Sequence, residues 1–394
     1  MSLDIAELLV FTLENGASDL HLTVDIPPSV RIHGEIEPMN YPPLNREECS
    51  DLIYSIMNDR QRALFEERLD LDFSLDFGAA GRFRVNVFRG HKGVGGVFRV
   101  IPSTIKTSQE LGLPDVVAKM ADYERGLVLV TGPTGSGKST TLAALIDSIN
   151  STRKGHILTI EDPIEFVHPH KQCVVNQREV GPHTHSFANA LRGALREDPD
   201  VILVGEMRDL ETISLAVSAA ETGHLVFGTL HTSSAAQTID RIIDVFPSHQ
   251  QGQIRAQLSE SLRGVVAQTL CRLATGKGRA AAVEILVSTP AVRNLIREGK
   301  TFQLPSVIQT GVKEGMQTID QSLAELVLAG KVLQEEALVK APDREGFLRY
   351  LKEGGRGGPD PTMGMGGFGG RQDLGSGPPT GMSGGINFGN LGRR

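Results

Sequence analysis

Residues 132–140, Gly-Pro-Thr-Gly-Ser-Gly-Lys-Ser-Thr, constrain the fold more than any other part of this sequence. They match the pattern G-x-x-x-x-G-K-[ST] of a phosphate-binding loop. The apolar run 127–130 precedes the loop and is typical of a buried strand, whereas 141–146 is typical of a helix. Strand, glycine-rich loop and helix, in this order, are the setting in which the motif binds phosphate. The sequence therefore predicts an α/β domain that binds a nucleoside triphosphate.

The residue types of this loop suit a polyphosphate. Glycine lets backbone N–H groups approach a phosphate without a Cβ atom in the way, and the following helix adds unpaired N–H donors at its N-terminus. Lys138 is predicted to contact the β- and γ-phosphates, and the Ser139 hydroxyl to bind Mg²⁺. The predicted nucleotide-binding residues of the loop are Gly132, Pro133, Thr134, Gly135, Ser136, Gly137, Lys138, Ser139 and Thr140.

Length, charge and cysteine content exclude several classes of protein. With 394 residues the chain has room for two domains, and its net charge of −7 disfavours nucleic-acid binding through a broad positive field. The three cysteines are far apart, which excludes a zinc site built from cysteines and predicts free thiols. No apolar stretch approaches the about 20 residues of a membrane-spanning helix, and the first residues do not resemble a signal peptide. We expect a soluble, intracellular protein.

Two regions of the chain have different patterns, and residues 102–115 are predicted to link them. The first region, 1–101, contains short runs in which apolar and polar residues alternate, as in strands that bury one face. It therefore predicts a small α+β domain with an antiparallel sheet. The predicted helices are 2–15 and 46–67, and the predicted strands are 18–22, 30–36, 71–77, 83–87 and 97–101.

The second region, 116–353, alternates strands with helices, which is the pattern of a mostly parallel α/β sheet. Its end is predicted to be mainly helical. Sixteen of the last 41 residues, 354–394, are glycine, so this stretch buries too little apolar surface to offset its chain entropy and predicts a disordered tail. The predicted strands are 127–131, 156–161, 201–204, 225–229 and 281–285, and the later helices are 235–244, 248–271 and 317–329.

Carboxylates follow two of these strands, where a P-loop site needs acids beside the phosphates. Glu206 follows the strand 201–204 and is predicted to act on the Mg²⁺ ion or on the attacking water. An acidic turn with Glu161, Asp162 and Glu165 follows the strand 156–161. Like charges this close are costly unless a cation or a catalytic role balances them. One of the three is therefore a candidate general base, and a solvated acidic turn is the alternative.

Histidines also lie near these strand ends. His224 precedes the strand 225–229 and His231 follows it, where an imidazole can sense the γ-phosphate or relay a proton. A lone loop histidine often has no such role. Four further histidines lie in loops without the spacing of metal ligands, so no metal site is expected from them: His168, His170, His183 and His185.

Four arginines lie in or beside the predicted strands of the first region: Arg82, Arg84, Arg89 and Arg99. Alternation puts Arg82 and Arg84 on the same face of their sheet. Phosphoryl transfer usually requires guanidinium groups to neutralise charge on the γ-phosphate. The alternative is that these arginines form a solvated sheet face.

Together these motifs resemble the secretion ATPases of type II secretion and type IV pilus systems. Residues 160–165 are similar to the acidic box of that family, 196–209 to its Walker B region and 221–232 to its histidine box. Within the family, 291–297 and 315–318 are similar to segments of the pilus retraction ATPases. The resemblance covers about residues 1–340 and does not account for the glycine-rich tail.

The resemblance implies a RecA-like P-loop ATPase domain preceded by a PAS-like domain, with ATP and Mg²⁺ as ligands. It implies a homo-hexamer at the cytoplasmic face of the inner membrane that acts on a pilus platform protein. A paralogous retraction ATPase is a further expected partner, and no nucleic acid is expected. The implied site residues are Glu165 as general base, Glu206 as Walker B carboxylate, Arg84 and Arg99 as phosphate-facing arginines, and Glu161, His224 and His231 from the two boxes.

The predicted function is therefore ATP hydrolysis that powers pilus retraction, or twitching motility. The first alternative is a pilus-extension or type II secretion ATPase, although many of those relatives carry a four-cysteine zinc site that this chain lacks. A nucleic-acid translocase is a further alternative, which the acidic net charge disfavours. A non-catalytic regulator is another, which the presence of Lys138 and Glu165 disfavours. The apolar stripe of 291–297 either packs on the core or contacts the load of the motor.

Overall fold

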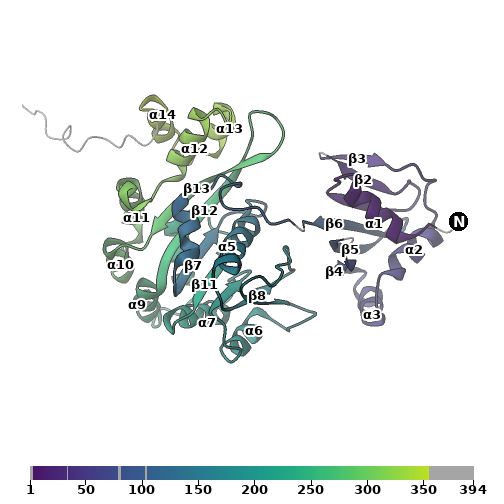
Figure 1. Cartoon of the computed structure of the whole chain (residues 1–394), viewed down its shortest axis with the longest axis horizontal. Coiled ribbons are helices and arrows are strands. Elements are labelled where there is room, and N and C mark those ends of the chain that lie inside the picture. Colours follow the sequence, from purple (N-terminus) through teal and green to yellow (C-terminus); the bar gives the residue numbers. More distant parts are fainter. Residues whose placement is uncertain (1–2, 33, 79–80, 103, 355–394) are drawn as a thin grey trace, which may run out of the picture. The chain divides into compact units, whose positions relative to one another are not determined.

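The computed structural model describes residues 3–354, apart from 33, 79, 80 and 103. The predicted tail, 354–394, lies outside this part of the chain except for its first residue. The described residues form two sheets, both visible in Figure 1. A six-stranded sheet has the order β3-β2-β1-β6-β5-β4, and a seven-stranded sheet has the order β13-β12-β7-β11-β10-β8-β9.

Every neighbouring pair in the six-stranded sheet is antiparallel, which confirms the predicted sheet type. The alternation expected from the sequence holds: Phe83, Val85 and Val87 are buried, while Arg82 and Arg84 lie on the opposite face. The strands are β1 (Asp19–Leu22), β2 (Ser29–Ile32), β3 (Glu35–Pro38), β4 (Asp70–Asp76), β5 (Arg82–Gly90) and β6 (Gly93–Ile101), and the helices are α1 (Ile5–Glu14), α2 (Arg46–Ser55) and α3 (Asp59–Arg68).

Two predictions in this region were wrong in detail. The single strand predicted at 30–36 is a hairpin, because the chain reverses near Gly34, whose φ of 96° favours glycine. The single helix predicted at 46–67 is two helices. Asn58 forms a capping box at the start of α3, so it begins a second helix where an uninterrupted one was expected.

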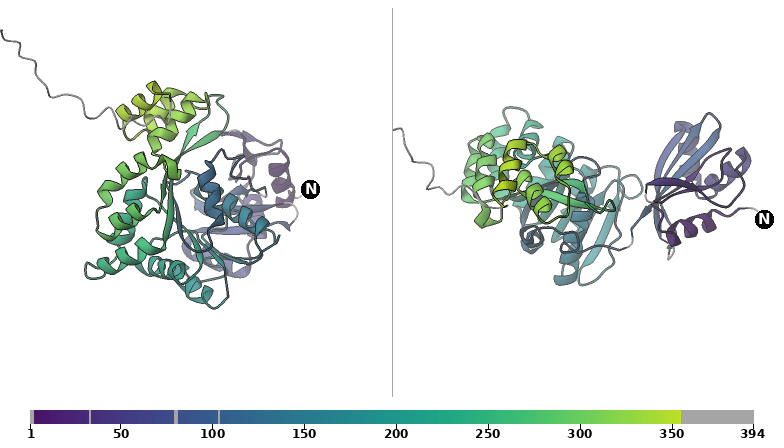
Figure 2. Two further views of the ribbon diagram at one scale, coloured as in Figure 1. Left: turned by 60° about the vertical axis from the view of Figure 1, so that its left-hand side comes forward. Right: turned by 90° about the horizontal axis from the view of Figure 1, so that it is seen from above.

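The seven-stranded sheet is parallel from β12 to β9, and only β13 is antiparallel to its neighbour. Successive residues of β7 pack into different cores: Leu127 and Leu129 into one, Val128 and Val130 into the other. Helices therefore cover both faces (Figure 2). The strands are β7 (Gly126–Thr131), β8 (His156–Glu161), β9 (Val174–Glu179), β10 (Val201–Val204), β11 (Leu225–Leu230), β12 (Leu262–Arg272) and β13 (Arg279–Val287).

The helices of this region include α5, which directly follows the glycine-rich loop, and a C-terminal group, α12 to α14, with its own small core around Leu323 and Phe347. In the described part of the chain, no helix combines the length and the apolarity needed to cross a bilayer. The helices are α4 (Asp115–Ala118), α5 (Lys138–Thr152), α6 (Phe187–Ala194), α7 (Leu210–Glu221), α8 (Ala235–Asp244), α9 (Gln251–Ser261), α10 (Pro290–Arg297), α11 (Leu304–Thr310), α12 (Ile319–Leu328), α13 (Gln334–Lys340) and α14 (Arg344–Lys352).

The predicted helix 248–271 was wrong in its second half. Helix α9 ends at Ser261, and the chain continues as β12, which lies between β7 and β13. Most of β12 is buried, so its apolar residues form a run without the alternation that identifies a half-exposed strand. Strand β9, at the other edge of the sheet, was not predicted.

Helix α10 contains the segment 291–297, whose contact with the load of the motor stays a prediction. Thr289 caps it and Pro290 occupies its first turn. Val292 and Ile296 are fully buried in the core of the seven-stranded sheet, and Leu295 packs against that core. The apolar stripe of this segment therefore packs on the body of the protein.

Candidate nucleotide-binding and catalytic site

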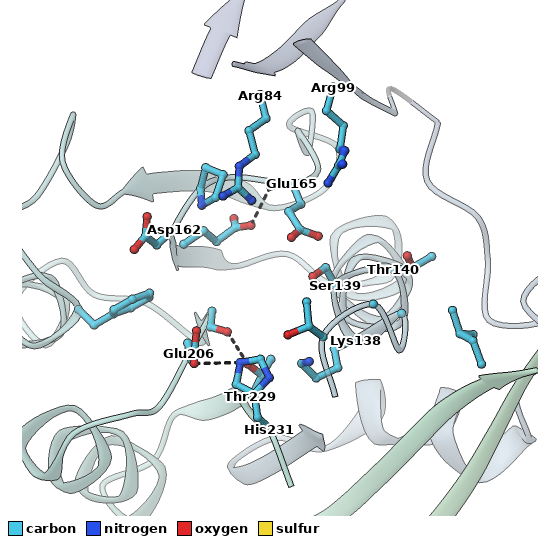
Figure 3. A pocket seen from close by; sticks show the side chains of 18 of the residues that line it. Arg84, Arg99, Lys138, Ser139, Thr140, Asp162, Glu165, Glu206, Thr229 and His231 are labelled. Atoms are coloured by element: carbon cyan, nitrogen blue, oxygen red, sulfur yellow. Dashed lines mark hydrogen bonds and ion pairs between the residues drawn. The ribbon is translucent and has the colours of Figure 1, made fainter. Parts of the chain in front are cut away.

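A cavity of about 450 Å³ lies at the carboxyl ends of the parallel strands, where α/β sheets commonly bind ligands (Figure 3). The glycine-rich loop and the residues after β8, β10 and β11 line it, and Arg84 and Arg99 of the six-stranded sheet point into it. Twelve of the predicted site residues line this cavity: Arg84, Arg99, Thr134, Gly135, Gly137, Lys138, Ser139, Thr140, Glu161, Glu165, Glu206 and His231.

The loop between β7 and α5 has the shape expected of a phosphate-binding loop. Gly132, Gly135 and Gly137 all have positive φ, and a Cβ atom on Gly132 would lie 2.3 Å from the carbonyl oxygen of Gln268. Gln268 also fixes the loop through its side chain: Nε2 donates to the carbonyl of Ser136 (2.6 Å), and Oε1 accepts from the hydroxyl of Thr141 (2.9 Å). Strand β12, which lies next to β7 in the sheet, thus holds the loop in place.

Two groups of the loop fit a polyphosphate ligand. The hydroxyl of Ser136 is buried and has no hydrogen-bond partner among the described residues. Among the described residues, Lys138 Nζ donates only to loop carbonyls, those of Gly132 (2.8 Å) and Pro133 (3.1 Å). Burial lowers the pKa of Lys138, and the nearby charges of Glu206 and Glu165 partly offset this effect. A bound phosphate would supply the anion that this half-buried ammonium group needs.

Glu206 lies two residues beyond the end of the fully buried strand β10. Its Oε1 lies 3.0 Å from His231 Nε2, and it also accepts a hydrogen bond from Arg208 Nε. The hydroxyl of Thr229 donates to the carbonyl of Gly205 and so ties the end of β10 to β11. Glu206 and Ser139 both line the cavity, and their carboxylate and hydroxyl oxygens are ligands of the type that Mg²⁺ prefers.

The acidic turn after β8 separates its carboxylates into different environments. Burial raises the pKa of Glu161, although its carboxylate accepts hydrogen bonds from Thr159 (2.7 Å) and Gln177 (3.1 Å). Burial also raises the pKa of Asp162, and Arg208 and Arg84 oppose this shift. Glu165 is exposed to the cavity, below Arg84 and Arg99 in Figure 3. Glu165 and Asp162 are both exposed and both line the cavity, so both are open to a water molecule.

Arg84 and Arg99 are cross-strand neighbours on β5 and β6. Arg99 Nε donates to Asp19 (2.9 Å), and Arg84 Nε lies 4.0 Å from Asp72. Both reach the cavity, so one sheet presents two guanidinium groups to the place where the loop would hold phosphates. A third arginine, Arg279 at the start of β13, lines the cavity as well and was not predicted.

Some predicted residues do not reach the cavity. Gly132, Pro133 and Ser136 belong to the loop but do not line it. His224 lies beyond the amino end of β11, at the opposite end of the strand from His231, and its Nδ1 is 2.9 Å from the carbonyl of Ala219. The structure therefore does not bring His224 to the predicted nucleotide in its own chain.

Known proteins resemble this chain over most of its length. Residues 3–339 match the family described as Type II/IV secretion system protein. The chain belongs to this family. Within it, the type IV pilus retraction ATPase PilT of Pseudomonas aeruginosa is 58% identical over 345 residues, which are 88% of this chain and 100% of PilT. A twitching motility protein of Neisseria gonorrhoeae is 56% identical over 318 residues, 81% of this chain and 85% of that protein.

Solved structures of similar proteins share the fold. A crystal structure of the pilus retraction motor PilT with bound ADP has a TM-score of 0.83 at 50% identity, and covers 88% of this chain and 99% of its own. The Legionella pneumophila ATPase DotB has a TM-score of 0.75 at 30% identity, over 86% and 96% of the two chains. The mixed α/β fold with a parallel sheet is thus common to this family.

Two of the four loop histidines accept hydrogen bonds from the backbone through their rings. His170 Nδ1 accepts from the backbone of Val175 and His183 Nδ1 from that of Glu179, both at 3.0 Å. His168 is 7% exposed, and its Nδ1 has no partner among the described residues. Burial lowers the pKa of His168 to about 4, and the charges of Asp147 and Lys171 act in opposite directions on it.

This histidine predicts a pH dependence of stability. His168 is neutral in the fold, whereas it takes up a proton in the unfolded chain below about pH 6.5. The unfolded state then binds more protons, so the stability linked to His168 is present above pH 6.5 and is lost as the pH falls toward 4. At pH 5 the loss amounts to about 2 kcal/mol. Urea denaturation of His168→Leu should show a drop in unfolding free energy between pH 7.5 and 5 that is smaller by about this amount.

The exposed His249 offers the control. His249→Gln should keep the pH dependence of the wild-type protein. An identical drop in unfolding free energy for His168→Leu and the wild type would contradict a buried, neutral His168.

Proposed function

We propose that this chain is an ATPase motor that hydrolyses ATP, with Mg²⁺, to power retraction of type IV pili in twitching motility. The observation that carries the proposal is the 58% identity to PilT over that protein's whole length. The type II secretion system ATPase E of Vibrio cholerae, by comparison, is 36% identical over 53% of its length. Retraction is therefore preferred to secretion or extension as the work that this motor performs.

The site supports a division of labour among its residues. The loop and Lys138 hold the phosphates, Ser139 and Glu206 hold Mg²⁺, and Glu165 takes a proton from the attacking water. The bound Mg²⁺ ion would neutralise charge on the β- and γ-phosphates. Arg84 and Arg99 neutralise the charge that develops on the γ-phosphate. His231 senses the γ-phosphate through its contact with Glu206.

The architecture of the motor follows the family. We assign residues 1–101 to a PAS-like domain, 102–115 to a linker and 116–353 to a RecA-like ATPase domain. We expect six copies to form a ring that works on the platform protein of the pilus machine, at the cytoplasmic face of the inner membrane. PilU of Pseudomonas aeruginosa, a type IV pilus ATPase, is 42% identical to this chain, so a paralogous ATPase is a further candidate partner.

Complementation tests the proposed function. The chain should restore twitching motility to a bacterium that lacks its own retraction ATPase, because hydrolysis at this site supplies the work of retraction. The Lys138→Ala variant, expressed to the same level, should not. Restored export of type II substrates or restored pilus extension, without twitching, would show that the motor performs a different kind of work.

A further inference from the structure

Glu179, the last residue of β9, is a buried carboxylate that the proposed mechanism does not use. Its exposed fraction is 3%, and it does not line the cavity. Three groups bind it: Arg82 Nη2 at 2.9 Å, the Ser74 hydroxyl at 2.9 Å and the backbone N–H of Ile164 at 3.1 Å. A buried charge is stable only when it is paired and hydrogen-bonded, and these three contacts meet that requirement for the Glu179 carboxylate.

The partners of Glu179 belong to the two sheets that form the cavity. Ser74 lies on β4 and Arg82 on β5, two residues before Arg84 and on the same face. Ile164 lies in the acidic turn after β8 and directly precedes Glu165. A single carboxylate thus connects the strand that carries Arg84 with the turn that carries Glu165.

The carboxylate itself is held in place from its own strand. The backbone N–H of Glu179 donates to His183 Nδ1 at 3.0 Å, and β9 pairs with β8 along its whole length. The neighbouring Arg178 faces the other side of β9, where it forms a separate ion pair with Glu197 at 2.8 Å that does not involve the Glu179 carboxylate. Because the end of β9 is held in this way, Glu179 can fix the positions of the acidic turn after β8 and of strand β5, which carries Arg84.

We propose that Glu179 is a positioning residue for ATP hydrolysis, which holds Arg84 and Glu165 in their places around the γ-phosphate. This inference rests on the proposed function. Glu179 acts through Arg82 and through the backbone of Ile164, and its side chain does not line the cavity. Displacing catalytic groups by about 1 Å can lower a rate by about 10²-fold. The loop that binds ATP is held separately, by Gln268, and does not depend on Glu179.

The test uses the full chain with Glu179 replaced by Gln. This change keeps the size of the side chain but removes the charge that binds Arg82. We expect kcat to fall by about 10²-fold, while the KM for ATP stays within about 3-fold of wild type. Arg178→Gln is the matched control, since it breaks the adjacent ion pair on β9 and should leave kcat unchanged.

A double-mutant cycle separates positioning from a merely structural role. If Glu179 acts through the arginine strand, Glu179→Gln should add little to the loss of activity already caused by Arg84→Ala. Losses that multiply in the double variant, or a wild-type kcat in Glu179→Gln, would overturn the inference. If Glu179→Gln does not fold, Ser74→Ala removes one bond from the same carboxylate and should lower kcat by about 3-fold; an unchanged kcat there would overturn it too. A wild-type chain without ATPase activity would instead overturn the proposed function itself.

Discussion

Replacing Lys138 with alanine should abolish ATP hydrolysis, with a fall in kcat of at least about 10³-fold. Lys138 Nζ lies inside the curve of the loop, within hydrogen-bond distance of the Gly132 and Pro133 carbonyls. In the ATP complex it supplies the positive charge that meets the β- and γ-phosphates, and alanine supplies none. The loop itself should keep its shape, because Gln268 and Thr141 hold it from β12 and α5.

Steady-state phosphate release by the purified chain measures this effect. Lys171→Ala is a suitable control, since Lys171 binds Asp147 of the same helix α5 at 2.7 Å and does not line the cavity. Both variants should melt near the wild-type temperature. Hydrolysis at the wild-type rate in Lys138→Ala would remove the basis for assigning 132–140 as the catalytic phosphate-binding loop.

Local patterns were enough to predict much of this site. The loop 132–140 is contiguous, and its strand and helix follow from adjacent residues, so no long-range contact was needed to locate it. Glu206 and Glu165 were placed at strand ends, and parallel strands bring such ends to one edge of a sheet. The alternation of β5 likewise placed Arg82 and Arg84 together on one face.

Tertiary contacts account for what the sequence did not reveal. Gln268 reaches the loop because 262–272 forms a strand beside β7, and a buried strand has the same apolar run as a buried helix. Arg279 enters the cavity from a strand more than 130 residues beyond the loop, and nothing in its neighbouring residues signals that position. His224 was grouped with His231 because the two residues flank one strand. The amino and carboxyl ends of a strand are, however, separated by its full length, so only His231 lies at the end where the cavity is.

The acidic turn illustrates how packing assigns roles that a sequence leaves open. Three carboxylates within five residues were equal candidates for the general base. In the fold Glu161 is committed to Thr159 and Gln177, and burial raises its pKa. Asp162 and Glu165 both reach the open cavity, and the charges of Arg208 and Arg84 lower the pKa of Asp162 against the effect of burial. Packing therefore sets Glu161 apart from the other two, and the preference for Glu165 over Asp162 stays a prediction from the family resemblance.

Glu165→Gln should therefore lower kcat by about 10³-fold while leaving ATP binding nearly intact. Glutamine has almost the same shape, so the turn and the contact between Glu179 and the backbone of Ile164 should persist. Unlike a carboxylate, the glutamine amide cannot accept a proton from water, which is what a general base must do. Nucleotide affinity should be preserved because the loop and Lys138, which bind the phosphates, are unchanged.

Equilibrium binding of a fluorescent ATP analogue and single-turnover hydrolysis measure the two effects separately. The expected variant binds the analogue with a Kd within about 3-fold of wild type and turns over slowly. Glu161→Gln serves as a comparison, because a buried glutamine can still accept the hydrogen bonds of Thr159 and Gln177, and its loss of activity should be much smaller. If Glu161→Gln were the more damaged of the two, the general base would be the buried carboxylate and the assignment of Glu165 would be wrong.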